Sequence, residues 1–512
     1  MDVFADLIYG FSVALSPVNL LYLAIGVLVG MVVGVMPGLG ASAGIAILLP
    51  LTFSMDPTSA IVMLAAIYYG AMFGGTITSV LINTPGESST VASTFDGYPL
   101  AQQGRAGPAL VLCAVGSFVA GTIGLILLTV LAPAFARLAQ SFGPSETFLV
   151  VMIGLLTLVV IAGGKWRYGV ISALFGFTLA TVGVDLGTGD QRYTFGSPEL
   201  ITGINFIPVA IGLFGIGELL YTLHQGEHTE EGGFIRVSGR GPELWPKRED
   251  WSESGGPMAR GSLLGFVVGI IPGAGATVAS LMSYSLEKTV SKTPERFGKG
   301  ALPGLVGPES SNNAASTGSM VPLLTLGIPG SASTAVLLGA FLLWGLQPGP
   351  LLMTQDPEFA WGLIGSMYLG NVMLVVLNVF AIPLFANIAR IPARIMVPIV
   401  IVLCTIGTFS VNGSIVETWI MLGCGVIGFF MKLYGYSPAA TVIALVLGPL
   451  AEETLRQSLI ISAGGLSIFY TRSMSLLLLI IIGLLIAAPL ALSIYRRRST
   501  RDDRLANRIS DV

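Results

Sequence analysis

Two apolar stretches of this 512-residue chain are interrupted by the same glycine-proline pattern, one stretch in each half. The first break reads Gly-Val-Met-Pro-Gly-Leu-Gly over residues 34–40, and the third reads Gly-Ile-Ile-Pro-Gly-Ala-Gly over residues 269–275. Each is followed by another Pro-Gly pair, within the second break at residues 83–90 and the fourth break at residues 327–334. The four breaks therefore occur in the same order in both halves.

These breaks restrict what the surrounding helices can do. Proline lacks a backbone N–H and glycine allows positive φ, so the pair ends one helix and permits an unusual turn. In a membrane, such a turn is tolerated only where protein or a water-filled cavity satisfies the freed backbone groups. A single break is more often a kink or a packing glycine. Four in register, two of them beside Ser, Thr or Asn, favour a transporter's binding site.

The composition places these stretches in a membrane. Hydrophobic residues make up 53% of the chain and charged residues 10%, against about 25% charged in soluble domains. Cys113, Cys404 and Cys424 lie in apolar runs, which predicts small buried hydrophobes rather than disulfides or metal ligands. The net charge of −3 indicates no particular partner, and no nucleic-acid partner is expected.

Apolar segments of about 20 residues, the length needed to span a bilayer, predict an all-α polytopic membrane protein. We expect about 10 to 12 transmembrane helices, some broken or re-entrant. The predicted organisation is a first repeat at 1–225, a cytoplasmic linker at 226–257, a second repeat at 258–495 and a basic cytoplasmic tail at 496–512.

Loop charges predict how the two repeats are oriented. The arginine-rich tail places the C-terminus in the cytoplasm, since cytoplasmic loops are enriched in Lys and Arg. The loop after the first break has only Asp56, whereas the loop after the third has Lys288, Lys292, Arg296 and Lys299. After the second and fourth breaks the bias reverses. Corresponding loops then face opposite sides, which indicates an inverted repeat, with a parallel repeat as the alternative.

A polar run over residues 307–318 interrupts the second half. Its Glu309, Asn312 and Asn313 supply side-chain oxygens suited to Na⁺, with Asn312 and Asn313 as candidate Na⁺ ligands, or a proton on Glu309. The alternative is that Glu309 caps a helix at the membrane surface.

The breaks contain no Lys or Arg, so an anion would be held by helix N-termini and hydroxyl groups, which could equally be caps without a ligand. The candidate substrate-binding residues are Pro37, Gly38, Gly40, Asn83, Thr84, Pro85, Gly86, Ser88, Ser89, Pro272, Gly273, Gly275, Pro329, Gly330, Ser331, Ser333 and Thr334.

Several functional classes have no support. The chain has no phosphate-binding loop, no His-Glu-x-x-His and no Gly-x-Ser-x-Gly, so we expect neither direct ATP coupling nor an enzyme. No cofactor is predicted besides a coupling ion. His224 and His228 could share a helical face as metal ligands, but solvated histidines are favoured.

Four motifs carry a family resemblance: Met-Pro-Gly-Leu-Gly-Ala at 36–41, Ile-Asn-Thr-Pro-Gly at 82–86, Pro-Glu-Ser-Ser-Asn-Asn-Ala at 308–314 and Leu-Gly-Ile-Pro-Gly-Ser at 326–331. With them the chain resembles, over about residues 18–495, the large membrane subunit of tripartite tricarboxylate transporters, the TctA family. The family's glycine-proline motifs fall on the four breaks and its polar motif on Glu309, Asn312 and Asn313.

The resemblance implies a secondary transporter of the bacterial inner membrane. It would work with a small membrane subunit and a periplasmic solute-binding protein, and would take up carboxylates such as citrate with an ion gradient, often Na⁺. The alternative from another class is a channel or scaffold subunit whose breaks serve packing only.

Overall fold

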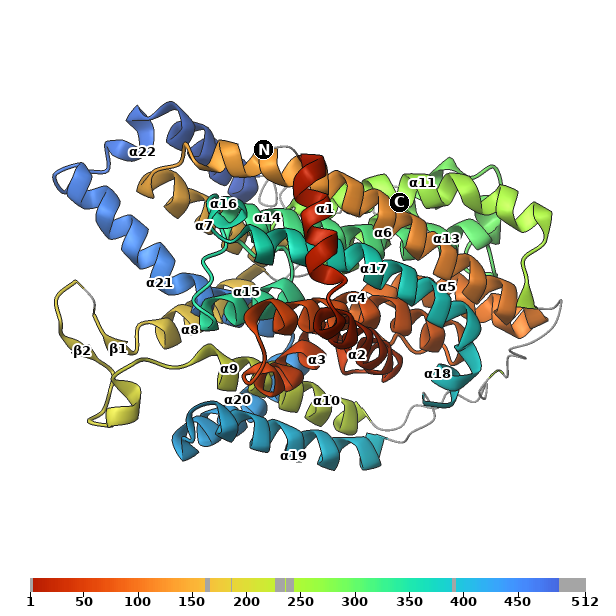
Figure 1. The fold of residues 1–512 in the computed structure, drawn as a ribbon, viewed down its shortest axis with the longest axis horizontal. Coiled ribbons are helices and arrows are strands. Elements are labelled where there is room, and N and C mark those ends of the chain that lie inside the picture. The colour runs from red at the N-terminus through yellow and green to blue at the C-terminus, as the bar shows by residue number, and fades with distance from the viewer. Residues whose placement is uncertain are drawn as a thin grey trace, which may run out of the picture.

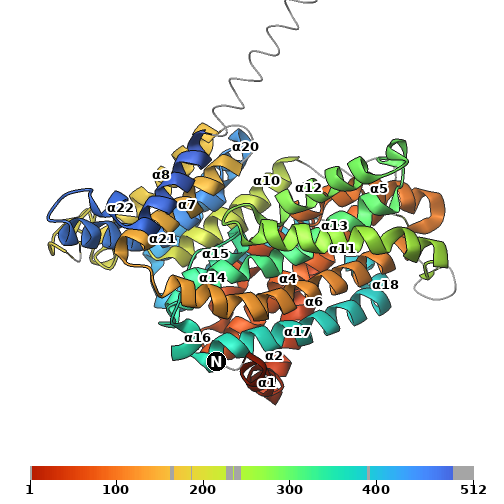
Figure 2. The same cartoon turned by 90° about the horizontal axis from the view of Figure 1, so that it is seen from above.

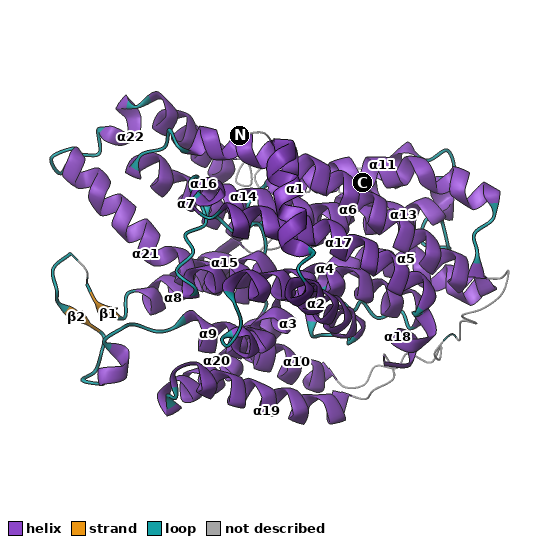
Figure 3. Cartoon of the chain, viewed as in Figure 1, coloured by secondary structure: helices purple, strands orange, loops and turns teal. Residues whose placement is uncertain are grey.

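The computed structural model describes residues 3–161, 166–185, 187–225, 235, 244–388 and 393–487. Most of these residues lie in helices (Figure 3). The strands in this part of the chain are β1 (Gly183–Val184) and β2 (Gln191–Arg192), which pair antiparallel. The predicted all-α fold class is therefore confirmed.

The helices of the first half surround the first and second breaks. They are α1 (Val3–Ala14), α2 (Pro17–Val35), α3 (Gly40–Leu48), α4 (Pro57–Leu81), α5 (Val91–Leu100), α6 (Ala106–Ala139), α7 (Pro144–Ile161), α8 (Trp166–Ala180), α9 (Phe206–Ala210) and α10 (Gly217–Gln225), with a π-helical segment at Ile211–Ile216.

The second half repeats the pattern of a long helix, a break and a further helix. Its helices are α11 (Arg248–Ile270), α12 (Gly275–Val290), α13 (Leu302–Gly318), α14 (Met320–Leu326), α15 (Ala332–Leu343), α16 (Leu352–Gln355), α17 (Pro357–Phe380), α18 (Ile382–Ile388), α19 (Ala393–Asn412), α20 (Ile415–Tyr434), α21 (Pro438–Ile461) and α22 (Ile468–Thr471).

Among the described residues, seven helices are long and apolar enough to cross a membrane: Pro17–Val35, Pro57–Leu81, Ser88–Ala139, Phe206–Gln225, Pro357–Phe380, Ile415–Tyr434 and Pro438–Ile461. Shorter apolar helices accompany them, and two of these, Gly40–Thr52 and Ala332–Leu343, begin directly after a break. The chain is thus a multi-pass membrane protein in which broken segments lie among complete spans.

Helices from the two halves pack against each other. Helix α1 packs across α17, and α8 packs against α21 (Figures 1 and 2). Glycines allow these contacts, because a side chain on Gly10 would overlap the backbone of Trp361 and one on Gly176 would overlap that of Thr441. The two halves consequently share one hydrophobic core.

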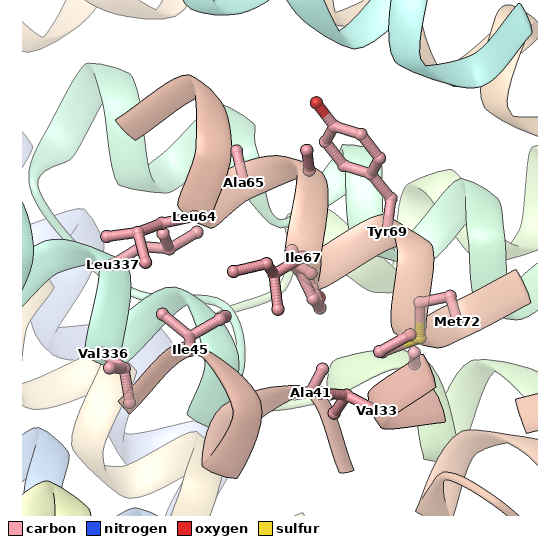
Figure 4. Packing of buried hydrophobic residues seen from close by; sticks show 14 of the residues in the cluster. Val33, Ala41, Ile45, Leu64, Ala65, Ile67, Tyr69, Met72, Val336 and Leu337 are labelled. Atoms are coloured by element: carbon pink, nitrogen blue, oxygen red, sulfur yellow. The ribbon is translucent and has the colours of Figure 1, made fainter. Parts of the chain in front are cut away.

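This core is densest around α4, which is almost entirely buried. Ile45 of α3, Leu64 of α4 and Leu337 of α15 meet there (Figure 4). Helices from after the first and fourth breaks therefore share one packing centre. The three cysteines are free and buried, which confirms their prediction as small buried residues.

The same close helix packing occurs once in each half. A side-chain atom on any of three glycines spaced one turn apart would overlap a carbonyl oxygen of the facing helix, as small-residue helix interfaces require. In the first half these glycines are Gly26, Gly30 and Gly34 of α2, against Met63, Ile67 and Ala71 of α4; in the second they are Gly261, Gly265 and Gly269 of α11, against Gly307, Ser311 and Ala315 of α13.

The end of the predicted linker is helical. Helix α11 begins at Arg248, ten residues before the predicted start of the second repeat at 258. Its polar first turn is capped, because Asp250 accepts the Lys247 N–H at 2.9 Å, and Arg105 pairs with Asp250 at 2.5 Å. Residues 226–234 and 236–243 of the predicted linker, His228 and the tail at 496–512 lie outside the described residues. His224 is exposed at the end of α10, with its ring against Phe429.

Ion pairs fasten the β-hairpin to α21. Arg456 donates to both carboxylate oxygens of Asp185, at 2.9 and 3.0 Å, and Arg192 donates to both of Glu452, at 2.9 and 3.2 Å. The Arg456 contact holds the pKa of Asp185 well below its usual range. The pairing with Arg456 therefore favours the charged form of this carboxylate.

Candidate functional site

The first and third breaks follow the same backbone course. Residues 36–39 separate α2 from α3, and residues 271–274 separate α11 from α12. In the first break Gly38 and Gly40 have φ of 89° and 66°, and in the third Gly273 and Gly275 have φ of 83° and 64°. Only glycine adopts these angles at little cost. The Pro-Gly-x-Gly pattern is thus required by the turn itself.

The second and fourth breaks also correspond. The Glu87 N–H donates to Thr90 Oγ1 at 3.4 Å, just as the Ser331 N–H donates to Thr334 Oγ1 at 2.7 Å. Each pair starts the helical segment after its break. Glu87 and Ser331 therefore hold equivalent positions, one with a carboxylate and the other with a hydroxyl group.

Gly86 and Gly330 are packing glycines in this arrangement. A side-chain atom on Gly86 would overlap the carbonyl oxygen of Gly34. One on Gly330 would lie 2.7 Å from Ser319 Cβ and 3.1 Å from the Gly269 carbonyl oxygen. Both glycines let their break approach the end of the preceding glycine-rich helix, so protein backbone occupies the space beside them. Their assignment to substrate binding stays a prediction.

The four breaks lie together in the folded chain. Glu87 Oε2 accepts the Ala41 N–H at 2.5 Å, which joins the second break to the start of α3. The Gly273 N–H donates to the Gly330 carbonyl at 3.0 Å, which joins the third break to the fourth. Contact between the halves comes from Ser88 Oγ and Thr277 Oγ1, which are 3.1 Å apart.

Tyr68 makes a further connection between the halves. This tyrosine of α4 places its hydroxyl 3.3 Å from Ser331 Oγ and 3.4 Å from Ser319 Oγ. Ser331 also accepts the Thr334 N–H at 3.2 Å as the N-cap of α15. The hydroxyl groups of Tyr68, Ser331, Ser88 and Thr277 thus line the junction of the breaks.

Other predicted hydroxyl residues face the protein. Ser89 Oγ donates to Met72 Sδ at 3.3 Å, and Thr334 is fully buried within its capping interaction. Ser333 is buried as well. Thr84 Oγ1 donates to the carbonyl of Ile82 at 3.2 Å, and Asn83 adopts a positive φ of 55°. Ser88 is exposed, and Ser331 and Thr84 are half-buried. Of these three, Ser88 and Ser331 take part in the contacts at the junction.

A second polar cluster surrounds Glu309. Its carboxylate is fully buried in the middle of α13 and accepts from Thr76 Oγ1 of α4 at 2.6 Å, from Ser93 Oγ of α5, and from Asn312 Nδ2 at 3.3 Å. No ion pair with Glu309 occurs within the described ranges. Because Glu309 is buried in the middle of α13 and not at its first turn, the alternative that it caps a helix at the membrane surface is wrong.

Asn313 extends this cluster to α6. Its Nδ2 lies 2.6 Å from Asn312 Oδ1, 2.8 Å from Ser117 Oγ and 3.0 Å from the Glu309 carbonyl. Nearby on α13, the buried Ser310 and Ser311 hydroxyls have no hydrogen-bond partner. The structure thus brings the three predicted ion-binding residues together and adds hydroxyl groups from three other helices.

Sequence reasoning missed several residues at these two places. Glu87 had a signal, because it is the only charged residue in the four breaks. Thr76 and Ser93 had a weaker one, as polar residues near apolar runs. Tyr68 and Thr277 had no sequence signal, since nothing in their neighbouring residues distinguishes them from other tyrosines and threonines. Only contacts between the two halves bring them to the junction of the breaks.

Comparison with known proteins agrees with this arrangement. A model of the tripartite tricarboxylate transporter TctA family matches residues 20–443. The chain is similar to an uncharacterized 52.8 kDa protein in the TAR-I ttuC' 3' region of Agrobacterium vitis, with 44% identity over 479 residues and 94% of each chain covered.

A second relative, an uncharacterized protein in the TAR-II ttuC' 3' region of the same organism, is 42% identical over 215 residues, which are 42% of this chain and 89% of the relative. No solved structure matches the chain. The family match covers most of the chain, including all four breaks and the Glu309 cluster, so this protein belongs to the TctA family as a membrane subunit of a tripartite tricarboxylate transporter.

Proposed function

We propose that this chain carries out ion-coupled uptake of carboxylates in the bacterial inner membrane, with Na⁺ or H⁺ as the coupling ion and a cytoplasmic C-terminus. A small membrane subunit and a periplasmic solute-binding protein would complete the transporter. The two repeats would be inverted, so that their breaks form one site near the middle of the membrane.

The observation that carries the proposal is the Glu309 carboxyl group. It is fully buried and has three side-chain donors but no cationic partner among the described residues. An isolated buried carboxylate costs several kcal/mol or more, so a proton or a bound cation must neutralise it. The cluster joins α13 to α4 and α5, which border the second break. Loading the ion would therefore bias helices that also shape the substrate site.

The carboxylate site would lie at the third and fourth breaks. In the first half the amino end of α3 already binds a carboxylate, that of Glu87. The second half has Ser331 in the equivalent position. Its hydroxyl, with those of Tyr68 and Thr277, could donate to a substrate carboxylate beside the amino end of α12, where the helix dipole favours negative charge.

The test is uptake by proteoliposomes that contain both membrane subunits and the binding protein. Labelled citrate, succinate and propionate should accumulate only when a Na⁺ or pH gradient is imposed. The channel or scaffold alternative is favoured by the packing roles of Gly86 and Gly330, and it predicts passive flux or none. Gradient-independent equilibration would contradict the proposed coupling.

Ser331→Ala tests the substrate site. Removing one hydroxyl donor costs roughly 0.5 to 1.5 kcal/mol, so the KM for the transported carboxylate should rise several-fold with normal membrane insertion. Because Ser331 also caps α15, Ser437→Ala, which removes the N-cap serine of α21, is the matched control. An equal KM change in both variants would mean that cap loss, rather than substrate contact, is being measured.

Single cysteines test the inverted topology. Ser54 in the loop after the first break and Thr293 in the loop after the third are both exposed. In a background without the three native cysteines, Ser54→Cys and Thr293→Cys should react with an impermeant thiol reagent from opposite sides of the membrane. Labelling of both from one side would support a parallel repeat instead.

A further inference from the structure

A basic side chain stands beside the first break, although the breaks themselves contain none. Lys432 lies in the last turn of α20, and its ammonium pairs with the carboxylate of Glu218 in the first turn of α10. The Lys432 side chain is 32% exposed and that of Glu218 15%. Lys432 Nζ also lies 5.6 Å from the centre of the Tyr221 ring. The pair thus sits at the edge of the packed interior and not deep within it.

Helix α10 brings this pair to the break. Thr222, one turn beyond Glu218, donates from Oγ1 to the Glu218 carbonyl at 3.0 Å. The same hydroxyl faces Gly38, so closely that a β-carbon there would overlap it. Lys432 is also within Coulombic range of the Glu87 carboxylate, which binds the start of α3. Helix α10, which carries Glu218, the ion-pair partner of Lys432, therefore packs against the first break.

The charges of the described residues beside the first break do not balance. Within this part of the chain, the carboxylates of Glu87 and Glu218 both interact with the ammonium group of Lys432. Glu87 is already bound by the Ala41 N–H and by Ser88 Oγ at 3.1 Å. Among the described residues around the first break, Lys432 is therefore the cation that an arriving anion can recruit, and Glu218 is the group it must replace.

We propose that Lys432 binds a second carboxylate group of the substrate, and that Glu218 holds the lysine in the empty transporter. This assignment rests on the proposed function and deepens it. One carboxylate would lie at the third and fourth breaks, and another would take the place of Glu218 at Lys432. Lys432 would then select di- and tricarboxylates over monocarboxylates, because a monocarboxylate cannot occupy both places.

Three variants separate this role from a structural ion pair: Lys432→Gln, Glu218→Gln and the double variant. In proteoliposomes with both partner subunits, Lys432→Gln should raise the KM for succinate and citrate about tenfold or more, equivalent to about 1.4 kcal/mol, and leave the KM for propionate unchanged. Glu218→Gln should leave the KM for succinate unchanged or lower it, because the competing carboxylate is gone. Lys432→Arg should restore most of the affinity.

The double variant decides between the two roles. If Lys432 binds substrate, the double variant behaves as Lys432→Gln does, with the same selective loss for succinate and citrate. If the ion pair only holds α10 against α20, both single variants should lose thermal stability and uptake of all three substrates should change alike. The double variant should then recover the lost stability. That pattern would overturn the assignment while gradient-driven uptake upheld the proposed function. Wild-type protein without any carboxylate uptake would overturn both.

Discussion

Replacing Glu309 by glutamine is expected to separate carboxylate movement from the ion gradient. Glutamine has nearly the same shape and can still bond to Thr76 and Ser93, but it can neither release a proton nor attract a cation. Charged hydrogen bonds are worth roughly 1.5 to 3 kcal/mol, so gradient-driven uptake should fall at least about tenfold. Downhill exchange of carboxylate should be reduced less. Proteoliposome uptake with and without imposed gradients measures both.

A matched control is another buried glutamate. Glu146 is also fully buried, but it pairs with Arg472 at 3.0 Å. Glu146→Gln should lower thermal stability, because it breaks that pair, and should leave the gradient dependence of uptake intact. Full gradient-driven uptake by Glu309→Gln would place the coupling ion elsewhere.

Hydroxyl variants of the cluster distinguish the two ions. Thr76→Val removes a group within 2.6 Å of the carboxylate. If Na⁺ binds there, loss of one oxygen ligand should raise the Na⁺ concentration needed for half-maximal uptake. If a proton is carried, the change should appear in the pH dependence of uptake instead.

The second large effect concerns Gly330. Gly330→Val should sharply reduce the amount of folded protein, because its β-carbon would lie 2.7 Å from Ser319 Cβ and its branched side chain needs still more room. Overpacking of this kind typically costs 1 to 3 kcal/mol, and the fourth break also fastens the third through Gly273. Yield, thermal stability in detergent and uptake per folded molecule are the measurements.

Gly423 of α20 provides the control, since a side chain there has no atom within 4 Å. Gly423→Val should fold nearly as well as the wild type. A Gly330→Val protein of normal yield and stability that fails to transport would instead mean that substrate, rather than packing, requires this glycine.

The amino-acid sequence by itself determined the local features of the site. The Pro-Gly-x-Gly turns follow from backbone chemistry, because glycine adopts the positive φ found at Gly38 and Gly273 at little cost. The polar run at Glu309 was visible because a carboxyl group contrasts with apolar surroundings. Helical spans were equally visible as apolar length. Each of these signals lies within a few neighbouring residues.

Only the tertiary structure decided which polar groups share a site. Thr76 and Ser93 reach Glu309 across more than 200 residues, and Ser88 meets Thr277 across 189. Hydroxyl residues are common along such a chain, and nothing local distinguishes one that turns inward, as Ser89 does, from one at the junction. Long-range packing selects among them, because the glycine rows let α2 approach α4 and α11 approach α13, and Gly86 and Gly330 then pack against the ends of α2 and α11.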